Sequence, residues 1–423
     1  MRVKIEAIVF PGRSLARDEG KVIFTDEGLP GEVVELQVEK NKENFIDAKT
    51  IQVIETAQSR VIPRCDHYKT CSSYQYIDHN EQIAIKRGQL KELFSRNLKI
   101  DLEDFEFRYP SRVWEYRNRI RVHVVRENDR AAFAYHLPEK FDKFIKIGRC
   151  YLASRQVNIL LGELLGLIDK TRISTLVELE IKENYKGEML LALYARDNSQ
   201  LALISESMTT LQKNFVLTGS VVLLPENGIL TEKTIFGKNN LEECAADRKY
   251  TIGAQSFFQV NREMLDAAIK DIESIHAQGT FTRMLDLYSG VGTFGIALAQ
   301  ASERVVLVES MQENIEYLKI NLALNSIGNA DYAHADSQTW LERDETGAQD
   351  LIIVDPPRKG LGAGMCEALL RTESKSLCCI SCNPSTLVRD LKILLTRYRI
   401  KKVIAYDFFP HTPHIETLVL LEK

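Results

Sequence analysis

The hydrophobic pattern of the chain changes in character near residue 250. Before that point, apolar and polar residues mostly alternate, as in segments 3–10, 20–25 and 31–40, which is typical of half-buried β-strands. The exception is segment 80–98, where apolar residues recur at helical spacing. After residue 250, apolar strands and amphipathic helices follow each other in turn. This alternation predicts a parallel, doubly wound sheet.

The pattern predicts three domains, because 423 residues exceed the usual size of one hydrophobic core. We expect a small β-barrel at 1–56, a central and mostly β domain at 57–250, and a Rossmann-like α/β domain at 251–423. Segment 401–423 contains two strands with no helix between them, so an antiparallel pair should end the last sheet. The predicted fold class is therefore multidomain α/β.

The composition argues against a membrane or secreted protein. No apolar run approaches the length needed to cross a bilayer, and segment 1–12 lacks the apolar core of a secretion signal. We therefore expect a cytoplasmic protein with no membrane partner. The formal net charge of −4 argues mildly against nucleic acid binding, so any contact with phosphates would require local basic patches.

Segment 108–121 is the strongest candidate for such a patch. Guanidinium and aromatic groups together suit phosphate contact and base stacking, and a solvated strand face is the alternative. The residues concerned are Arg108, Tyr109, Arg112, Trp114, Tyr116, Arg117, Arg119 and Arg121.

A glycine-rich segment, DLYSGVGTFG at 286–295, lies where a strand turns into a helix. Its glycines let the backbone approach a ligand at the helix N-terminus. Glu309, at the end of the next strand, is placed to accept hydrogen bonds from ribose hydroxyls, with a solvated strand end as the alternative. The pattern serves dinucleotides and S-adenosylmethionine alike, so it leaves both cofactors open.

Two further motifs follow strands of the same domain. Asp355 begins the Pro-stiffened loop DPPRKG after an apolar strand, at the sheet edge where open α/β folds bind ligands, although an Asp that merely caps a turn is the alternative. Cys382, in the polar turn SCNP, would face the same crevice beside a helix N-terminus that favours thiolate. Cys379 and Cys382 also form a C-x-x-C, which is an alternative redox or zinc pair, although no second pair lies nearby.

A thiol beside a methyl donor has a specific chemical use. Uracil C5 is a poor nucleophile, but addition of a thiolate at C6 makes an enolate that can attack a sulfonium methyl group. A base must then remove the C5 proton. Glu416 is the candidate, since desolvation would raise its pKa, and His411 and His414 are alternatives that could instead brace the loop.

The motifs DLYSGVGTFG, DPPRKG, SCNPSTLVRDL and FPHTPHIETLVLL, in this order, closely resemble the RNA 5-methyluridine methyltransferases, the group of RlmD and TrmA. Upstream, GAQSFFQVN resembles the family's entry into a class I methyltransferase domain, and 1–56 resembles its OB-like TRAM barrel. The resemblance implies S-adenosylmethionine as cofactor, Cys382 as nucleophile and Glu416 as base. It also implies cofactor contacts by Gln259, Tyr288, Glu309 and Asp355. Phe257 or Phe258 would stack on a flipped base or pack in the core.

The cysteines of the first half depart from the family pattern. Members with an iron–sulfur cluster have C-x5-C-x2-C and a distant fourth Cys, whereas this chain has Cys65, Cys71, then Tyr74 in the third place, and Cys150. Four thiolates are the usual requirement for a [4Fe-4S] cluster. A cluster with an outside ligand and a metal-free loop of buried thiols both stay open.

The resemblance also bears on the partner. It implies an RNA substrate, with 23S rRNA favoured over tRNA because of the TRAM-like segment, and no protein partner is predicted. Three other functions stay open: a cytosine-C5 methyltransferase, a nicotinamide-dependent oxidoreductase that uses the glycine loop, and a non-catalytic RNA-binding protein.

Overall fold

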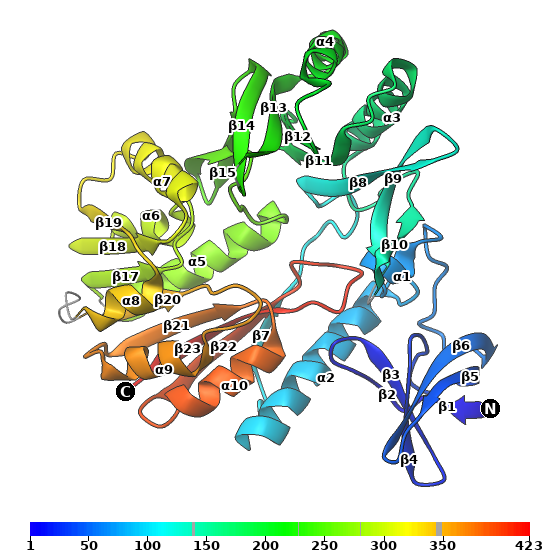
Figure 1. Ribbon diagram of the computed structural model, residues 1–423. Coiled ribbons are helices and arrows are strands. Elements are labelled where there is room, and N and C mark those ends of the chain that lie inside the picture. Colours follow the sequence, from blue (N-terminus) through cyan, green and yellow to red (C-terminus); the bar gives the residue numbers. More distant parts are fainter. Residues whose placement is uncertain (138–139, 227, 280, 344–348) are drawn as a thin grey trace.

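Three large sheets organise the computed structural model, which describes residues 1–137, 140–226, 228–279, 281–343 and 349–423 (Figure 1). The N-terminal strands form a small blue domain, the central strands lie in the cyan and green part, and the C-terminal sheet lies in the yellow to red part. Among the described residues, no helix is long and apolar enough to span a membrane. The cytoplasmic location stays a prediction.

The N-terminal sheet has six strands around a small apolar core. Alternate residues of each strand point inward, as Val34 and Leu36 do on one strand and Ile46 and Ala48 on the next. In sheet order the strands are β1 (Arg2–Lys4), β5 (Val33–Asn41), β6 (Phe45–Glu55), β4 (Lys21–Thr25), β3 (Arg13–Asp18) and β2 (Ala7–Val9).

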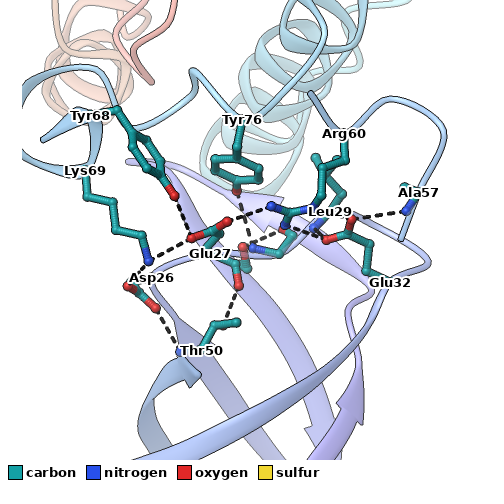
Figure 2. A network of polar contacts seen from close by, with 12 residues as sticks. Asp26, Glu27, Leu29, Glu32, Thr50, Ala57, Arg60, Tyr68, Lys69 and Tyr76 are labelled. Carbon is teal, nitrogen blue, oxygen red and sulfur yellow. Dashed lines mark hydrogen bonds and ion pairs between the residues drawn. The ribbon is translucent and has the colours of Figure 1, made fainter. Parts of the chain in front are cut away.

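A polar network fixes this domain against the segment that follows it (Figure 2). The Arg60 guanidinium donates to Glu32 at 2.7 Å and to Glu27 at 2.6 Å, and Glu27 also accepts from Tyr68 at 2.9 Å. Burial opposes ionisation, but hydrogen bonds from Lys69 and Arg60 hold the pKa of Glu27 below its ordinary value. The N-terminal domain is therefore tied to the cysteine loop, which contains the short helix α1 (Tyr68–Cys71).

The long helix α2 (His79–Leu98) leads from this loop toward the C-terminal sheet (Figure 1). It starts where the Asp78 side chain accepts from the Asn80 N–H at 2.9 Å, and it buries one helical stripe that includes three polar residues. The buried residues are Gln82, Ile85, Lys86, Gln89, Leu90 and Phe94.

The central sheet has seven strands, with α3 (Arg155–Thr171) and α4 (Leu201–Leu211) on one face. The hairpin of β15 (Asn240–Ala245) and β16 (Arg248–Gly253) packs with its other face and with the C-terminal domain. In sheet order the seven strands are β10 (Lys140–Lys146), β9 (Arg130–Leu137), β8 (Arg119–Glu127), β11 (Leu176–Glu183), β12 (Met189–Ala195), β13 (Leu217–Glu226) and β14 (Ile229–Gly237), and a 3₁₀ turn, η1 (Gln212–Asn214), follows α4.

The C-terminal sheet has eight strands, and the five from β19 to β21 in sheet order run parallel. The central strands β20 and β21 are buried on both faces, in agreement with the continuous apolar run at 351–354. In sheet order they are β19 (Ala330–His334), β18 (Arg304–Glu309), β17 (Arg283–Leu287), β20 (Leu351–Val354), β21 (Ser376–Ser381), β23 (Glu416–Glu422), β22 (Arg399–Tyr406) and β7 (Glu106–Arg108). The predicted doubly wound sheet and its closing antiparallel pair are both confirmed.

Helices cover both faces of this sheet. They are α5 (Arg262–Gly279), α6 (Thr293–Ala299), α7 (Gln312–Leu324), α8 (Ser337–Glu342), α9 (Gly362–Arg371) and α10 (Pro384–Leu394). Two elements from far upstream complete it: Leu90 and Phe94 of α2 share its core, and β7 pairs with β22. The structure therefore joins α2 and β7, which the hydrophobic pattern assigned to the central domain, to the C-terminal sheet.

Candidate active site

Five of the predicted site residues lie along one edge of the C-terminal sheet. Glu309 ends β18, Tyr288 follows β17, Asp355 follows β20, Cys382 follows β21 and Glu416 begins the antiparallel β23. Because the sheet order is β18, β17, β20, β21, β23, these residues lie in the same order, with neighbouring strands about 4.8 Å apart. The edge is the one at which open α/β sheets bind ligands.

The strand register brings Cys382 and Glu416 together. Ser381 pairs with Thr417 in the antiparallel ladder, so the next position on each strand puts Cys382 opposite Glu416. On the other side, Val354 pairs with both Leu287 and Cys379, which places Asp355 level with Tyr288 on one neighbouring strand and two positions before Cys382 on the other.

The turn after β17 requires glycine, which has no Cβ, at two positions. Gly290 and Gly292 have φ of 57° and 92°, in the left-handed region. A Cβ at Gly292 would lie 2.5 Å from the Leu318 side chain, whereas a Cβ at Gly290 would meet nothing within 4 Å. The turn is thus packed on its inner side and open at Gly290, where a ligand can approach the backbone.

The Glu309 carboxylate is buried, so the alternative interpretation of Glu309 as a solvated residue at a strand end is wrong. It is 7% exposed and accepts three backbone N–H groups, from Gly290 at 2.9 Å, Ser310 at 2.8 Å and Met311 at 2.7 Å. These bonds join the glycine turn to the start of α7.

Asp286 is a site residue to which the sequence analysis gave no role, although it begins the glycine motif. One carboxylate oxygen accepts from the Gly295 N–H at 2.8 Å, and the other, Oδ1, is buried without a partner. Burial, together with the nearby Asp355 and Glu309, raises the pKa of Asp286 to about 7. An orphaned acidic oxygen of this kind fits a ligand that brings a donor or a positive charge.

The charge of this pocket distinguishes the two open cofactors. Asp286, Glu309 and Asp355 gather around the glycine turn, and burial raises the pKa of Asp355 to about 7 as well. Three acidic groups disfavour the pyrophosphate of a dinucleotide, since like charges repel strongly in a partly buried site. They favour a cationic nucleoside such as S-adenosylmethionine.

Cys382 is half-buried at the start of α10, whose N-cap is Asn383. Burial first, and then Glu416, raise the pKa of the Cys382 thiol to about 11, while Arg358 opposes them. The predicted stabilisation of the thiolate by the helix N-terminus is therefore opposed by desolvation, which favours the neutral thiol. Cys379 and Cys382 are both free thiols: Cys379 is buried in the apolar core of the sheet, whereas Cys382 lies in the turn beyond it.

Glu416 is 3% exposed, and burial together with Asp355 raises its pKa well above the ordinary value, against the opposing charge of Arg358. His414 lies close by, with Nε2 3.2 Å from the Arg358 guanidinium, and burial lowers its pKa to about 4. His411 instead stacks on Trp114 at 3.8 Å, away from Cys382. Of the three candidate bases, Glu416 lies opposite Cys382, His414 contacts Arg358, and His411 packs on Trp114 within the loop.

Gln259 lies on the loop between β16 and α5, where the central sheet meets the C-terminal domain. The Asn118 side chain donates to the Gln259 carbonyl at 3.0 Å, and the buried Lys182 ammonium donates to the carbonyls of Gly253 and Ser256, both at 2.7 Å. Phe257 is 54% exposed beneath the Arg119 guanidinium.

Of the two phenylalanines of this loop, Phe257 is the exposed one and Phe258 is buried, at 5% exposure, so only Phe257 is available for stacking. Lys182 carried no signal in the sequence, because one charged residue in a strand is ordinarily exposed.

The cysteine loop does not fit an iron–sulfur cluster. Cys65, Cys71 and Cys150 lie near one another. Burial is the main cause that raises the pKa of the Cys65 and Cys71 thiols, and the neighbouring Cys150 raises both further. Tyr74, in the place of the third motif cysteine, is 1% exposed in a separate apolar cluster, and its hydroxyl accepts from Gln89 at 2.9 Å. Within the described ranges, no group of three or more His, Cys, Asp or Glu side chains is arranged to hold a metal ion.

Several members of the predicted basic patch at 108–121 make contacts within the protein, and the role of the patch in RNA binding stays a prediction. Arg108 pairs with Asp271 at 2.9 Å and with Glu106, and Arg121 pairs with Glu178. Other members pack internally: Trp114 stacks on His411, Tyr116 is buried, and the Nε atom of Arg117 is buried beside Tyr116. Tyr109, Arg112 and Arg121 are the exposed members, although Arg121 is paired with Glu178, and Arg119 is partly exposed.

Comparisons with known proteins agree with this architecture. The family model tRNA (uracil-5-)-methyltransferase matches residues 78–423, and the TRAM domain model matches residues 1–51. A 23S rRNA (uracil(1939)-C(5))-methyltransferase RlmD from Mannheimia succiniciproducens is 29% identical, covering 100% of this chain and 96% of the relative. An uncharacterized RNA methyltransferase from Caldanaerobacter subterraneus is 30% identical, covering 100% and 98%.

Among solved structures, the Pyrococcus abyssi tRNA (uracil-54, C5)-methyltransferase in complex with S-adenosyl-L-homocysteine matches with a TM-score of 0.80 at 24% identity, covering 100% of this chain and 99% of the other. The likeness extends over all three domains and supports the predicted fold class.

Proposed function

This chain belongs to the tRNA (uracil-5-)-methyltransferase family, and we propose that it methylates C5 of a uridine in RNA through a covalent bond between Cys382 and C6. One observation carries the mechanistic part: Cys382 and Glu416 occupy opposing positions on neighbouring strands, with Asp355 one strand further along. A nucleophile and a base at this separation can act on adjacent carbons of one planar ring.

The methyl donor is S-adenosylmethionine, and its contacts in this chain are a proposal. Glu309 would accept from the ribose hydroxyls, and Tyr288, Asp355 and Gln259 would complete the site around the glycine turn. The acidic surroundings, with the orphaned oxygen of Asp286, support a cationic ligand. When bound, S-adenosylmethionine supplies an electrophilic methyl group toward C5.

The residues of the chain would act in sequence on the uracil ring. The Cys382 sulfur adds to C6, and the electrons of the C5–C6 double bond move into an enolate, which makes C5 a nucleophile. After methylation, the Glu416 carboxylate takes the C5 proton, the double bond re-forms and the sulfur leaves as thiolate. The raised pKa of Glu416 suits this step, because it makes the carboxylate a stronger base.

Arg358 would assist the first step. Its guanidinium lies near both Cys382 and Glu416 and lowers the pKa of the Cys382 thiol, although burial and Glu416 together keep that pKa raised. A positive charge beside the sulfur stabilises the thiolate that must form before addition.

We propose 23S rRNA as the target and tRNA as the second candidate, with the reaction in the cytoplasm. The RlmD relative that acts on 23S rRNA matches along the whole chain, and the archaeal protein that shares the fold acts on tRNA. Mass spectrometric mapping of 5-methyluridine in both RNAs, from cells with and without this gene, should show one site lost from 23S rRNA. No difference in either RNA would refute the proposal.

RNA containing 5-fluorouridine tests the covalent step, because fluorine at C5 cannot leave as a proton. The wild-type protein should form an adduct with this RNA that survives denaturation, whereas Cys382→Ala should form none. Adduct formation by Cys382→Ala would show that another residue is the nucleophile.

A further inference from the structure

The loop that leads into Glu416 is shaped by side chains from distant parts of the chain. We call residues 407–415, between β22 and β23, the base loop. Its backbone contacts come from four separate segments: Asn261 donates to the Phe408 carbonyl at 3.2 Å, Lys86 to that of Phe409 at 3.2 Å, Tyr116 to that of Pro410 at 3.2 Å, and the Tyr74 N–H to that of His411 at 2.9 Å. The conformation of the base loop therefore depends on residues outside it.

Helix α2 is attached to the middle of the base loop through Gln82. This side chain is fully buried, its Oε1 accepts from the His411 N–H at 2.8 Å, and its Nε2 lies 3.0 Å from His411 Nδ1. The Gln82 amide also donates to the Ile77 carbonyl at 2.9 Å. One glutamine thus holds both the backbone and the ring of His411, whose φ of 66° lies in the left-handed region.

Lys86 lies one helical turn beyond Gln82 and holds the start of the base loop. Its ammonium is 2.6 Å from the Asp407 carboxylate, and both side chains are fully buried. Asp407 also lies 3.2 Å from His79 at the beginning of the same helix. Two buried polar residues on one face of α2 therefore fix both the first residue and the middle of the base loop.

The far end of the base loop reaches the reacting groups. His414 contacts the Arg358 guanidinium at 3.2 Å, and Arg358 acts electrostatically on both Cys382 and Glu416. His414 follows His411 by three positions and Glu416 by five, so the backbone at His411 is directly connected to both. This connection runs from α2, which follows directly on the cysteine loop.

We infer that Gln82 is a positioning residue for removal of the C5 proton: by holding His411, it sets the geometry of Glu416 and Arg358 at the methylated adduct. The inference rests on the proposed covalent mechanism. Removal of the C5 proton is the step that releases the adduct, so a misplaced base should let the adduct form and slow its breakdown.

The test compares two glutamines of one helix. Gln82→Leu removes the contacts to the base loop, whereas Gln89→Leu removes two contacts of similar length, to the Ile8 carbonyl and the Tyr74 hydroxyl, both at 2.9 Å, from a side chain that is 3% exposed. Each variant is mixed with S-adenosylmethionine and transcribed 23S rRNA, with transcribed tRNA in parallel. The covalent adduct that survives denaturation and the methylated product are then measured.

We expect Gln82→Leu to raise the ratio of adduct to product by about tenfold over wild type, a fraction of what a general base contributes. Gln89→Leu should leave the ratio unchanged. Gln82→Glu, which keeps the acceptor for the His411 N–H, should give an intermediate ratio. A variant that merely misfolds loses adduct and product together, so an unchanged ratio in Gln82→Leu overturns the inference.

Glu416→Gln separates this inference from the mechanism on which it rests. If Glu416→Gln accumulates adduct but Gln82→Leu does not, the inference is wrong and the proposed base stands. If Glu416→Gln forms no excess adduct, the proposed role of Glu416 is itself wrong.

Discussion

The two ends of the active-site edge are held by different kinds of contacts. At the Glu309 end, the carboxylate is fixed by backbone groups of Gly290, Ser310 and Met311, which belong to the adjoining turn and helix. At the Glu416 end, the base loop is held by Gln82 and Lys86, more than 300 positions away in the sequence. The cofactor end is therefore a local structure, whereas the nucleophile end exists only once the chain has folded around it.

This difference has a functional meaning. A short motif can bind the same nucleoside cofactor in many proteins, because the geometry is complete within a strand, a turn and a helix. The base loop is connected instead to α2 and the cysteine loop, which adjoin the N-terminal domain that the TRAM model matches. Under the inference made for Gln82, contacts of this kind would let the part of the chain that precedes the methyltransferase sheet influence the chemistry.

Replacement of Lys86 tests the long-range end most severely. Lys86→Met leaves the buried Asp407 carboxylate with His79 as its remaining ionic partner, and breaking a buried pair in this way costs about 3–5 kcal/mol. Urea denaturation should show that loss in the free energy of unfolding. Affinity of the folded fraction for S-adenosylmethionine should stay unchanged if the two ends are independent.

Two matched variants control this experiment. Lys91→Met removes an ammonium of the same helix at the surface and should change stability by less than about 0.5 kcal/mol. The double variant Lys86→Met with Asp407→Asn should regain part of the loss, because no unpaired charge remains. A single variant as stable as wild type would contradict the importance of the buried pair.

Replacement of Glu309 tests the local end. Both carboxylate oxygens accept backbone N–H groups, so Glu309→Gln puts an amide donor against one of them and removes a negative charge from the pocket. We expect the affinity for S-adenosylmethionine, measured by titration calorimetry, to fall by roughly 10- to 100-fold. Glu303→Gln, at the exposed opposite end of the same strand, is the control, and an equal loss there would rule out a specific role for Glu309.

The pH dependence of the reaction reports on the nucleophile end. The pKa of the Cys382 thiol is raised to about 11. At any pH below this value, the fraction of thiolate therefore increases by about tenfold for each unit by which the pH rises. With substrate below saturation, kcat/KM should therefore rise as the pH increases from 6 to 9. A flat profile over this range would show that substrate binding, not thiol ionisation, limits the reaction.

The local features were predictable because a short stretch of sequence contains their geometry. Asp355 and Cys382 each follow an apolar strand, and the alternation of strand and helix places the ends of such strands at one edge. The turn after β17 was also predictable from the sequence, because Gly290 and Gly292 supply the left-handed backbone conformation that the turn requires. Its position in the turn after β21 distinguishes Cys382 from Cys378 and Cys379, which lie within the strand, but its predicted role also depended on the glycine motif, Asp355 and Glu416.

The long-range features were not predictable because nothing in a sequence identifies the partner of a buried polar residue. Gln82 and Lys86 interrupt the apolar stripe of α2, and their partners lie in a loop at the opposite end of the chain. β7 has three residues, too few for a pattern. Arg108 looks like an RNA contact in the sequence, since an arginine paired with a distant Asp271 cannot be told from a free one.

Lys182 tests whether the cofactor end is held by local contacts alone, because it contacts this end from a distant part of the sequence. Its buried ammonium donates to Gly253 and Ser256, just before Gln259, and burial lowers its pKa to about 8. If Gln259 contacts the cofactor, Lys182→Met should loosen its loop and weaken S-adenosylmethionine binding by less than about tenfold, with kcat little changed. Lys186→Met, at the surface of the same hairpin, should have no effect. If the KM for S-adenosylmethionine equals that of wild type, only residues close in sequence to the glycine turn hold the cofactor end. If KM rises and kcat does not change, the central sheet contributes to cofactor binding.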